Sequence, residues 1–122
     1  MVHTLNRTTN GLIRKFSGNI SAHEILKSNF DLQASPDFEV IKYIINDFTE
    51  VTDYAVDTDH TKIYASTDDI ISDSKGKFKI AIVATEPGHI ALAENYREEM
   101  KNMYFKCEIF PDTEQALIWA EQ

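Results

Sequence analysis

The four histidines, His3, His23, His60 and His89, are the first candidates for acid–base or metal chemistry, and they are widely spaced in the chain. No His-Glu-x-x-His segment and no serine–histidine–aspartate spacing accompanies them. We therefore predict exposed or capping histidines and no catalytic residue. His89 remains a candidate for contact with a ligand. It falls in the first turn of an expected helix after a buried strand, where α/β proteins tend to bind ligands.

Residues 57–61, Asp-Thr-Asp-His-Thr, offer the first three ligand positions of a calcium loop. However, Lys62 stands where such a loop needs glycine, and Asp68 stands where it needs a bidentate glutamate. Neither glycine-rich phosphate-binding motif, G-x-G-x-x-G or G-x-x-x-x-G-K-[ST], occurs. The single cysteine, Cys107, rules out an intrachain disulfide and a multi-cysteine metal site. We predict no metal and no cofactor.

Length and charge limit the class of protein. The chain has 122 residues, which suits a single domain spanning 1–122. Twenty acidic and twelve basic residues give a net charge of −8, which disfavours nucleic acid or an anionic membrane surface as a partner. Apolar residues make up 43%, which indicates a folded core. Without an apolar run long enough to span a bilayer or a signal pattern, we expect a cytoplasmic protein.

The N-terminal segment has the pattern of a β-hairpin followed by a helix. Two β-prone stretches, Val2–Leu5 and Leu12–Phe16, flank Asn10-Gly11, a dipeptide typical of a type I′ turn. Ser21 and Glu24 then form a capping box that starts a helix. Ala22, Ile25, Leu26, Asn29 and Phe30 lie at helical spacing, and the helix should end before Ser35-Pro36.

The remaining chain alternates strands with helices. Two apolar runs, Val40–Ile45 and Phe78–Ala84, predict neighbouring central strands, with Asp47 just after the first. Phe105–Ile109 alternates as a half-exposed edge strand. Helices are expected over about 58–73, from Pro87 onward, and after the cap residue Asp112. This order predicts an α/β fold with a mostly parallel sheet, whose narrow helix faces leave one side fairly open.

Three groups of residues match motifs of one protein family. The C-terminal match comprises Phe110, Asp112, Glu114 or Gln115, Ala116 and Trp119, with Ala120 in place of the usual leucine. The looser N-terminal matches are Gly18-x-Ile20-Ser21-x-x-Glu24 and Ile44-Ile45-Asn46-Asp47-Phe48. Together these groups resemble the SpoIIAA-like proteins of the STAS superfamily. The resemblance implies a STAS/SpoIIAA-like mixed, mostly parallel sheet with an N-terminal hairpin and about four helices, largely on one side.

The resemblance also implies a function. Relatives in the wider superfamily are anti-anti-sigma factors, which bind a kinase and are phosphorylated on a serine at the start of a helix. Only Asp47-Phe48-Thr49-Glu50-Val51 matches that site here, and Thr58 is the nearest hydroxyl and the phosphorylation candidate. We expect a non-catalytic domain that binds another protein through the surface Phe48–Thr61. Its partner-binding candidates are Asp47, Tyr54, Asp57 and Thr58. The alternative hypotheses are a carrier or sensor of a small apolar or lipid-like ligand, and an enzyme. A homodimer is a further expectation.

Overall fold

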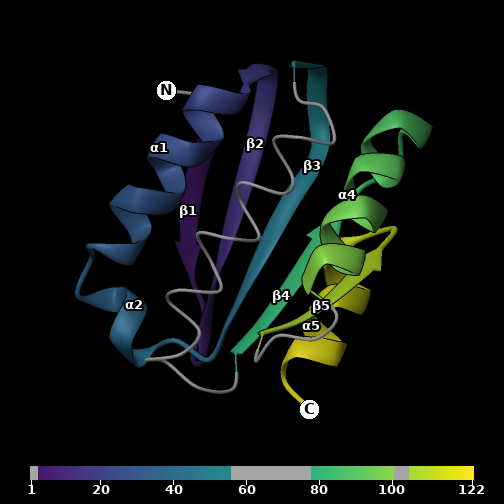
Figure 1. Cartoon of the computed structure of the whole chain (residues 1–122). Coiled ribbons are helices and arrows are strands. Elements are labelled where there is room, and N and C mark those ends of the chain that lie inside the picture. The colour runs from purple at the N-terminus through teal and green to yellow at the C-terminus, as the bar shows by residue number, and fades with distance from the viewer. Residues whose placement is uncertain (1–2, 56–77, 101–104) are drawn as a thin grey trace.

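The computed structural model describes residues 3–55, 78–100 and 105–122, and in this part five strands form one sheet in the order β1-β2-β3-β4-β5 (Figure 1). β1 runs antiparallel to β2, and the other neighbours are parallel. This confirms the predicted mixed, mostly parallel sheet. The elements are β1 (His3–Arg7), β2 (Gly11–Ser21), α1 (Ala22–Gln33), α2 (Asp37–Val40), β3 (Tyr43–Ala55), β4 (Phe78–Val83), α4 (Pro87–Met100), β5 (Phe105–Phe110) and α5 (Thr113–Ala120). The helix expected over 58–73 lies outside the described residues.

The N-terminal hairpin is confirmed, but its turn differs from the prediction. Arg7 pairs with Leu12, and the Thr8 N–H donates to the Gly11 carbonyl at 2.9 Å. Among the described residues only Gly18 has a positive φ, so the connection is not a type I′ turn. A Cβ at Gly11 would overlap the ring of Tyr43. Glycine is required here for close packing against that ring.

The first central strand begins later and continues further than its sequence predicts. Val40 ends the short helix α2 and is exposed, and β3 starts at Tyr43. The predicted strand ends at Ile45, whereas β3 continues as far as Ala55. Pairing with β2, which reaches Ser21 opposite Ala55, holds this second half of β3 extended. The sequence does not predict this second half of the strand, because polar residues separate its apolar residues and leave no continuous apolar run.

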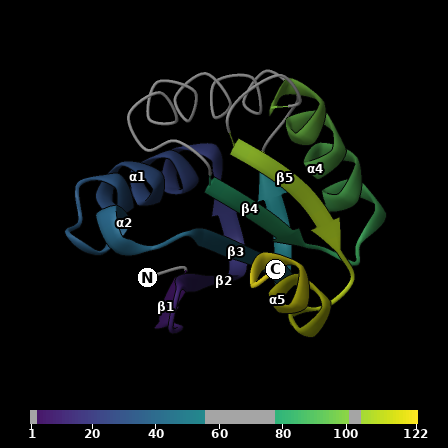
Figure 2. The ribbon, with the colours of Figure 1, turned by 90° about the horizontal axis from the view of Figure 1, so that it is seen from below.

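Helices cover both faces of the sheet, and Figure 2 shows α1, α2 and α4 on one face and α5 on the other. The larger core lies under the first three and contains Ile44 and Ile82, whose predicted burial is confirmed. The smaller core joins Tyr43, Ile45, Ala81, Val83, Ala116 and Ala120. The expectation of one fairly open side is therefore wrong where α5 packs on β3 and β4. Ala116 and Ala120 of α5 are buried against those strands, and Leu117 and Trp119 pack beside them.

Most predicted helix boundaries are confirmed. The Ser21–Glu24 capping box starts α1, and Asp112 caps α5 by accepting from the Gln115 N–H at 2.8 Å. Phe30, placed by helical spacing on the inner face of α1, is instead half exposed. Pro87 begins α4, as its missing N–H allows. None of the helices described here has the length and apolar character to cross a membrane.

Candidate functional site

β3 extends well beyond the end of β4. It pairs with β4 from Tyr43 to Asp47, whereas its pairing with β2 continues to Ala55. In the described part of the chain no strand pairs with β3 on the β4 side after Asp47. The upper halves of β2 and β3 therefore project from the sheet as a two-stranded ribbon, visible at the top of Figure 1. We call residues 17–21 of β2 with 48–55 of β3 the β2–β3 projection.

Two irregularities in the pairing bend this projection. Lys15 pairs with Asp47, but Ser17 pairs with Glu50, so β3 carries one extra residue there. A second extra residue of β3 falls where the pairing passes from Gly18 and Val51 to Asn19 and Asp53. Gly18 has φ +73°, a conformation that favours glycine, and adding a Cβ there would meet no other atom within 4 Å. Such bulges bend strands and are frequent near functional sites.

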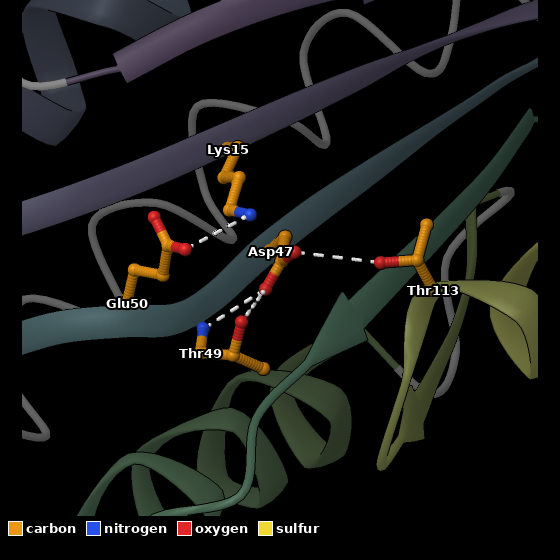
Figure 3. Close-up of polar contacts among 5 residues, drawn as sticks. All are labelled: Lys15, Asp47, Thr49, Glu50 and Thr113. Atoms are coloured by element: carbon orange, nitrogen blue, oxygen red, sulfur yellow. Dashed lines mark hydrogen bonds and ion pairs between the residues drawn. The ribbon is translucent and has the colours of Figure 1, made fainter.

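Asp47 stabilises the first irregularity. Its Oδ1 accepts from the Thr49 N–H at 2.9 Å and from the Thr49 hydroxyl at 2.7 Å (Figure 3). Its Oδ2 accepts from the hydroxyl of Thr113, the first residue of α5, at 3.4 Å. The carboxylate is 5% exposed, and no cation of the described residues lies within ion-pair distance of it. It is stabilised by neutral donors and by the positive end of the α5 dipole.

An ion pair also joins β2 to β3 beside Asp47. Lys15 lies opposite Asp47 in the strand register, yet its Nζ pairs with the Glu50 carboxylate at 3.2 Å (Figure 3). Both side chains of this pair are partly exposed, so the pair contributes at most about 1 kcal/mol. Further along, the Thr52 hydroxyl donates to the Asn19 side chain at 3.1 Å. These contacts join β2 to β3 across the projection while leaving polar side chains at its surface.

The surface of the projection is polar and its base is apolar. In residues 3–55, 78–100 and 105–122, no three His, Cys, Asp or Glu side chains are close enough together to hold a metal ion. Thr49, Glu50 and Thr52 are exposed on the projection, while Phe48 and Val51 anchor it in the larger core. The ring of Phe48 stacks on that of Phe16 with centroids 4.9 Å apart. Exposed polar groups thus lie on a firmly packed base.

Two solved structures share this arrangement of elements. The anti-sigma factor antagonist SpoIIAA in its unphosphorylated form is 11% identical, covers 95% of this chain and 94% of its own, and has a TM-score of 0.63. The chain has a SpoIIAA-like fold. An uncharacterised DUF3478-family protein with a SpoIIAA-like fold from Shewanella loihica is 18% identical over 97% of this chain and 91% of its own, with a TM-score of 0.54. No protein-family model and no curated protein matches the chain.

Within this SpoIIAA-like fold, the predicted site residues differ in how far the structure places them. Asp47 is buried beneath the projection, where it positions the backbone. Tyr54 belongs to β3, opposite Ile20, and its side chain is not described. Asp57 and Thr58 lie outside the described residues, as does the segment considered for calcium. Whether these residues contact a partner stays a prediction.

The structure adds Thr113, Thr49 and Lys15 to the predicted region. Thr49 lies two residues from Asp47, so a local turn between them could have been predicted from the sequence. Thr113 is 66 positions from Asp47, and only the topology of the sheet brings the two together. No sequence pattern indicates that the start of α5 contacts β3 at Asp47.

Proposed function

We propose that this chain is a non-catalytic regulatory domain that binds a protein partner through the β2–β3 projection. The observation that carries the proposal is the likeness of fold, almost end to end, to SpoIIAA, an antagonist of an anti-sigma factor. An antagonist of that kind acts on another protein. The proposal transfers only this general role, because the two sequences are 11% identical.

The surface of the projection supports recognition of a basic partner. Glu50 is exposed, the sequence adds Asp53, Asp57 and Asp59 nearby, and the whole chain has a net charge of −8. A surface with this sign attracts cationic segments and speeds their association. Tyr54 supplies an aromatic side chain of the type that interfaces favour. In this proposal Asp47 positions the surface from below, and Tyr54, Asp57 and Thr58 contact the partner.

Phosphorylation of Thr58 is the less favoured form of regulation. A phosphate would add nearly two negative charges to a segment that already contains Asp57 and Asp59. We therefore propose that the partner recognises the unmodified surface. Replacement of Thr58 by alanine should then weaken binding only through the lost contact, and replacement by glutamate should not strengthen it.

The test is affinity capture of partners by the purified chain and its variants. Glu50→Lys reverses a charge on the projection, and Tyr54→Ala removes the aromatic side chain. The matched control Glu39→Lys makes the same charge change on α2, far from the projection. A specific partner should be retained by the wild type and Glu39→Lys. It should be bound about tenfold more weakly by the two projection variants, a loss of roughly 1.4 kcal/mol.

Two further measurements separate recognition from folding and from self-association. The double variant Lys15→Glu/Glu50→Lys restores the ion pair, so it should be as stable as the wild type by thermal denaturation while still losing the partner. Sedimentation equilibrium tests whether the projection binds a second copy of this chain instead of another protein. If all projection variants capture the same proteins as the wild type while remaining folded, the proposed surface is in the wrong place.

A further inference from the structure

A pocket of about 230 Å³ lies between α1 and the β1–β2 hairpin, away from the β2–β3 projection. In the antiparallel pairing Leu5 lies opposite Arg14 and Arg7 opposite Leu12, so Leu5 and Arg7 share the face of the sheet that α1 covers. β1 lies at one edge of the sheet, and its residues 4–7 are exposed. The pocket thus lies between the edge strand and the flank of the helix.

Three leucines form the apolar wall of this pocket. Leu12 is buried in the larger core, Leu32 packs against that core, and Leu5 is half exposed on β1. A short aliphatic chain placed against these side chains would bury apolar surface from both partners. The volume is below the 300–1,000 Å³ typical of drug-sized ligands, which indicates a small molecule and argues against a full lipid chain.

Opposite charges line the same pocket. Arg7 is held in place because its Nη1 donates to the Gly11 carbonyl at 2.8 Å and to the Thr8 carbonyl at 3.3 Å. The rest of its guanidinium makes no hydrogen bond to another described residue. Asp31 approaches Lys27 only to 3.9 Å, with both side chains 71% exposed, so its carboxylate stays accessible. A positioned cation and an available anion therefore face one small volume.

A buried hydroxyl completes the polar lining. Ser28 is 6% exposed, lines the pocket, and accepts a hydrogen bond from Arg14 Nη1 at 2.9 Å. Because that bond uses the oxygen as an acceptor, the hydroxyl hydrogen can be donated elsewhere. Among the described residues, this hydroxyl donates no hydrogen bond. A buried donor of this kind gains free energy when a ligand carboxylate accepts from it.

We propose that this pocket binds a small zwitterion with a short aliphatic chain, an amino acid in chemical terms. The leucine wall takes the aliphatic chain. Arg7 pairs with the ligand carboxylate, and Asp31 pairs with its ammonium group. A plain carboxylic acid would meet the Asp31 charge and a plain amine the Arg7 charge, so only a molecule with both groups is favoured at both positions.

The experiment is a titration of the full ¹⁵N-labelled chain followed by NMR. L-leucine carries its two charges on one carbon, and 6-aminohexanoate carries them at opposite ends of the chain, so the two probes distinguish α- from ω-amino acids. Saturable shifts at Leu5, Leu12 and Leu32 are expected for at least one probe, with a dissociation constant of about 1 mM or tighter. Hexanoate and hexylamine, which each lack one charge, should bind about tenfold more weakly.

Variants test the two charges separately. Arg7→Gln and Asp31→Asn should each raise the dissociation constant about tenfold. Lys27→Gln is the matched control on α1, and it should leave binding unchanged. Arg7→Gln removes hydrogen bonds within the hairpin and could loosen it. Asp31→Asn alters an exposed side chain, so it tests the proposal even in that case. Absence of saturable shifts, equal binding of hexanoate or hexylamine, or unchanged affinity in Asp31→Asn would each overturn the proposal. The proposed protein-binding surface is elsewhere and would be unaffected.

Discussion

Asp47 links two distant parts of the chain by accepting hydrogen bonds from neutral donors. We predict that Asp47→Ala lowers the free energy of unfolding by about 1–3 kcal/mol, because it removes the acceptor for the Thr49 N–H and hydroxyl and for the Thr113 hydroxyl. Asp47→Asn should cost less, since its amide oxygen still accepts from Thr49 and its amide group can donate to Thr113. Urea denaturation gives both values. Equal losses would show that the negative charge itself matters at this position.

Tyr43 makes stability depend on alkaline pH. Burial, followed by the hydrogen bond to Glu121 and the negative charge of that carboxylate, raises the pKa of its hydroxyl above the ordinary value of 10.0, although the hydrogen bond to Thr8 acts in the opposite direction. The hydroxyl contacts Thr8 Oγ1 at 2.6 Å and donates to Glu121 Oε1 at 3.0 Å. Above pH 10 the unfolded chain loses this proton while the folded chain retains it, so stability is fully present below that pH and declines as pH rises through the folded-state pKa.

The measurement compares urea midpoints of the wild type and Tyr43→Phe between neutral pH and pH about 11. Tyr43→Phe should be less stable near neutrality, because it loses the bonds to Thr8 and Glu121, and its midpoint should decline less steeply above pH 10. The two proteins differ only at this hydroxyl, so the difference between their pH profiles isolates Tyr43. Parallel pH profiles for the two proteins would refute the assignment.

At the level of single residues, the sequence predicts those contacts that are local. Ser21 with Glu24, and Asp112 with Gln115, are three residues apart, and their capping bonds form as predicted. The bonds of Asp47 to Thr113 and of Tyr43 to Glu121 join residues that are 66 and 78 positions apart. Such contacts depend on how strands and helices stack, which no local spacing reveals.

At the scale of the elements, close packing against Tyr43 explains why glycine stands at position 11, where the hairpin enters β2. Gly11→Ala should destabilise the fold by about 1–3 kcal/mol, because the new Cβ would overlap the Tyr43 ring. Gly18→Ala should cost about 1–2 kcal/mol for a different reason, its φ of +73°. A double-mutant cycle in a Tyr43→Leu background distinguishes the two. The smaller side chain should reduce the cost of Gly11→Ala and leave that of Gly18→Ala unchanged.

β4 carries the larger core on one face and the smaller core on the other. Ile82 belongs to the larger core, so Ile82→Ala should lower the free energy of unfolding by about 2–5 kcal/mol through the cavity it leaves. Chemical denaturation measures this loss. The matched control is Ile118→Ala on α5, an exposed isoleucine, which should cost far less. A loss below about 0.5 kcal/mol in Ile82→Ala would contradict the assignment of β4 to the core.

For the whole molecule, the sequence predicted the fold class because strands such as Phe78–Val83 are apolar runs interrupted only by Lys79, and because the C-terminal motif resembles a known family. It did not predict that β3 continues to Ala55, because the polar residues after Asp47 become a strand only by pairing with β2. The candidate site lies on that unpredicted half. The motif match located this region in the sequence, whereas its conformation depends on how β3 pairs with β2.

The arrangement of layers predicts which parts of the molecule open first. Strands β3, over Tyr43–Asp47, and β4 are paired on both edges and covered by helices on both faces. Their amides should exchange with solvent only on global unfolding. β1 has one strand neighbour and is exposed from Thr4 to Arg7, so its amides should exchange by local opening and much faster.

Native-state hydrogen exchange followed by NMR measures both groups of amides in one experiment. In Ile82→Ala the protection of the β3 and β4 amides should fall by the same free energy as global stability, because these amides report the global transition. The β1 amides should keep their wild-type rates, because their opening leaves the core around Ile82 intact. If β1 exchanged as slowly as β4, or followed global stability in Ile82→Ala, the hairpin would be part of one cooperative unit with the sheet. A ligand in the pocket between β1 and α1 would then have to stabilise the whole molecule.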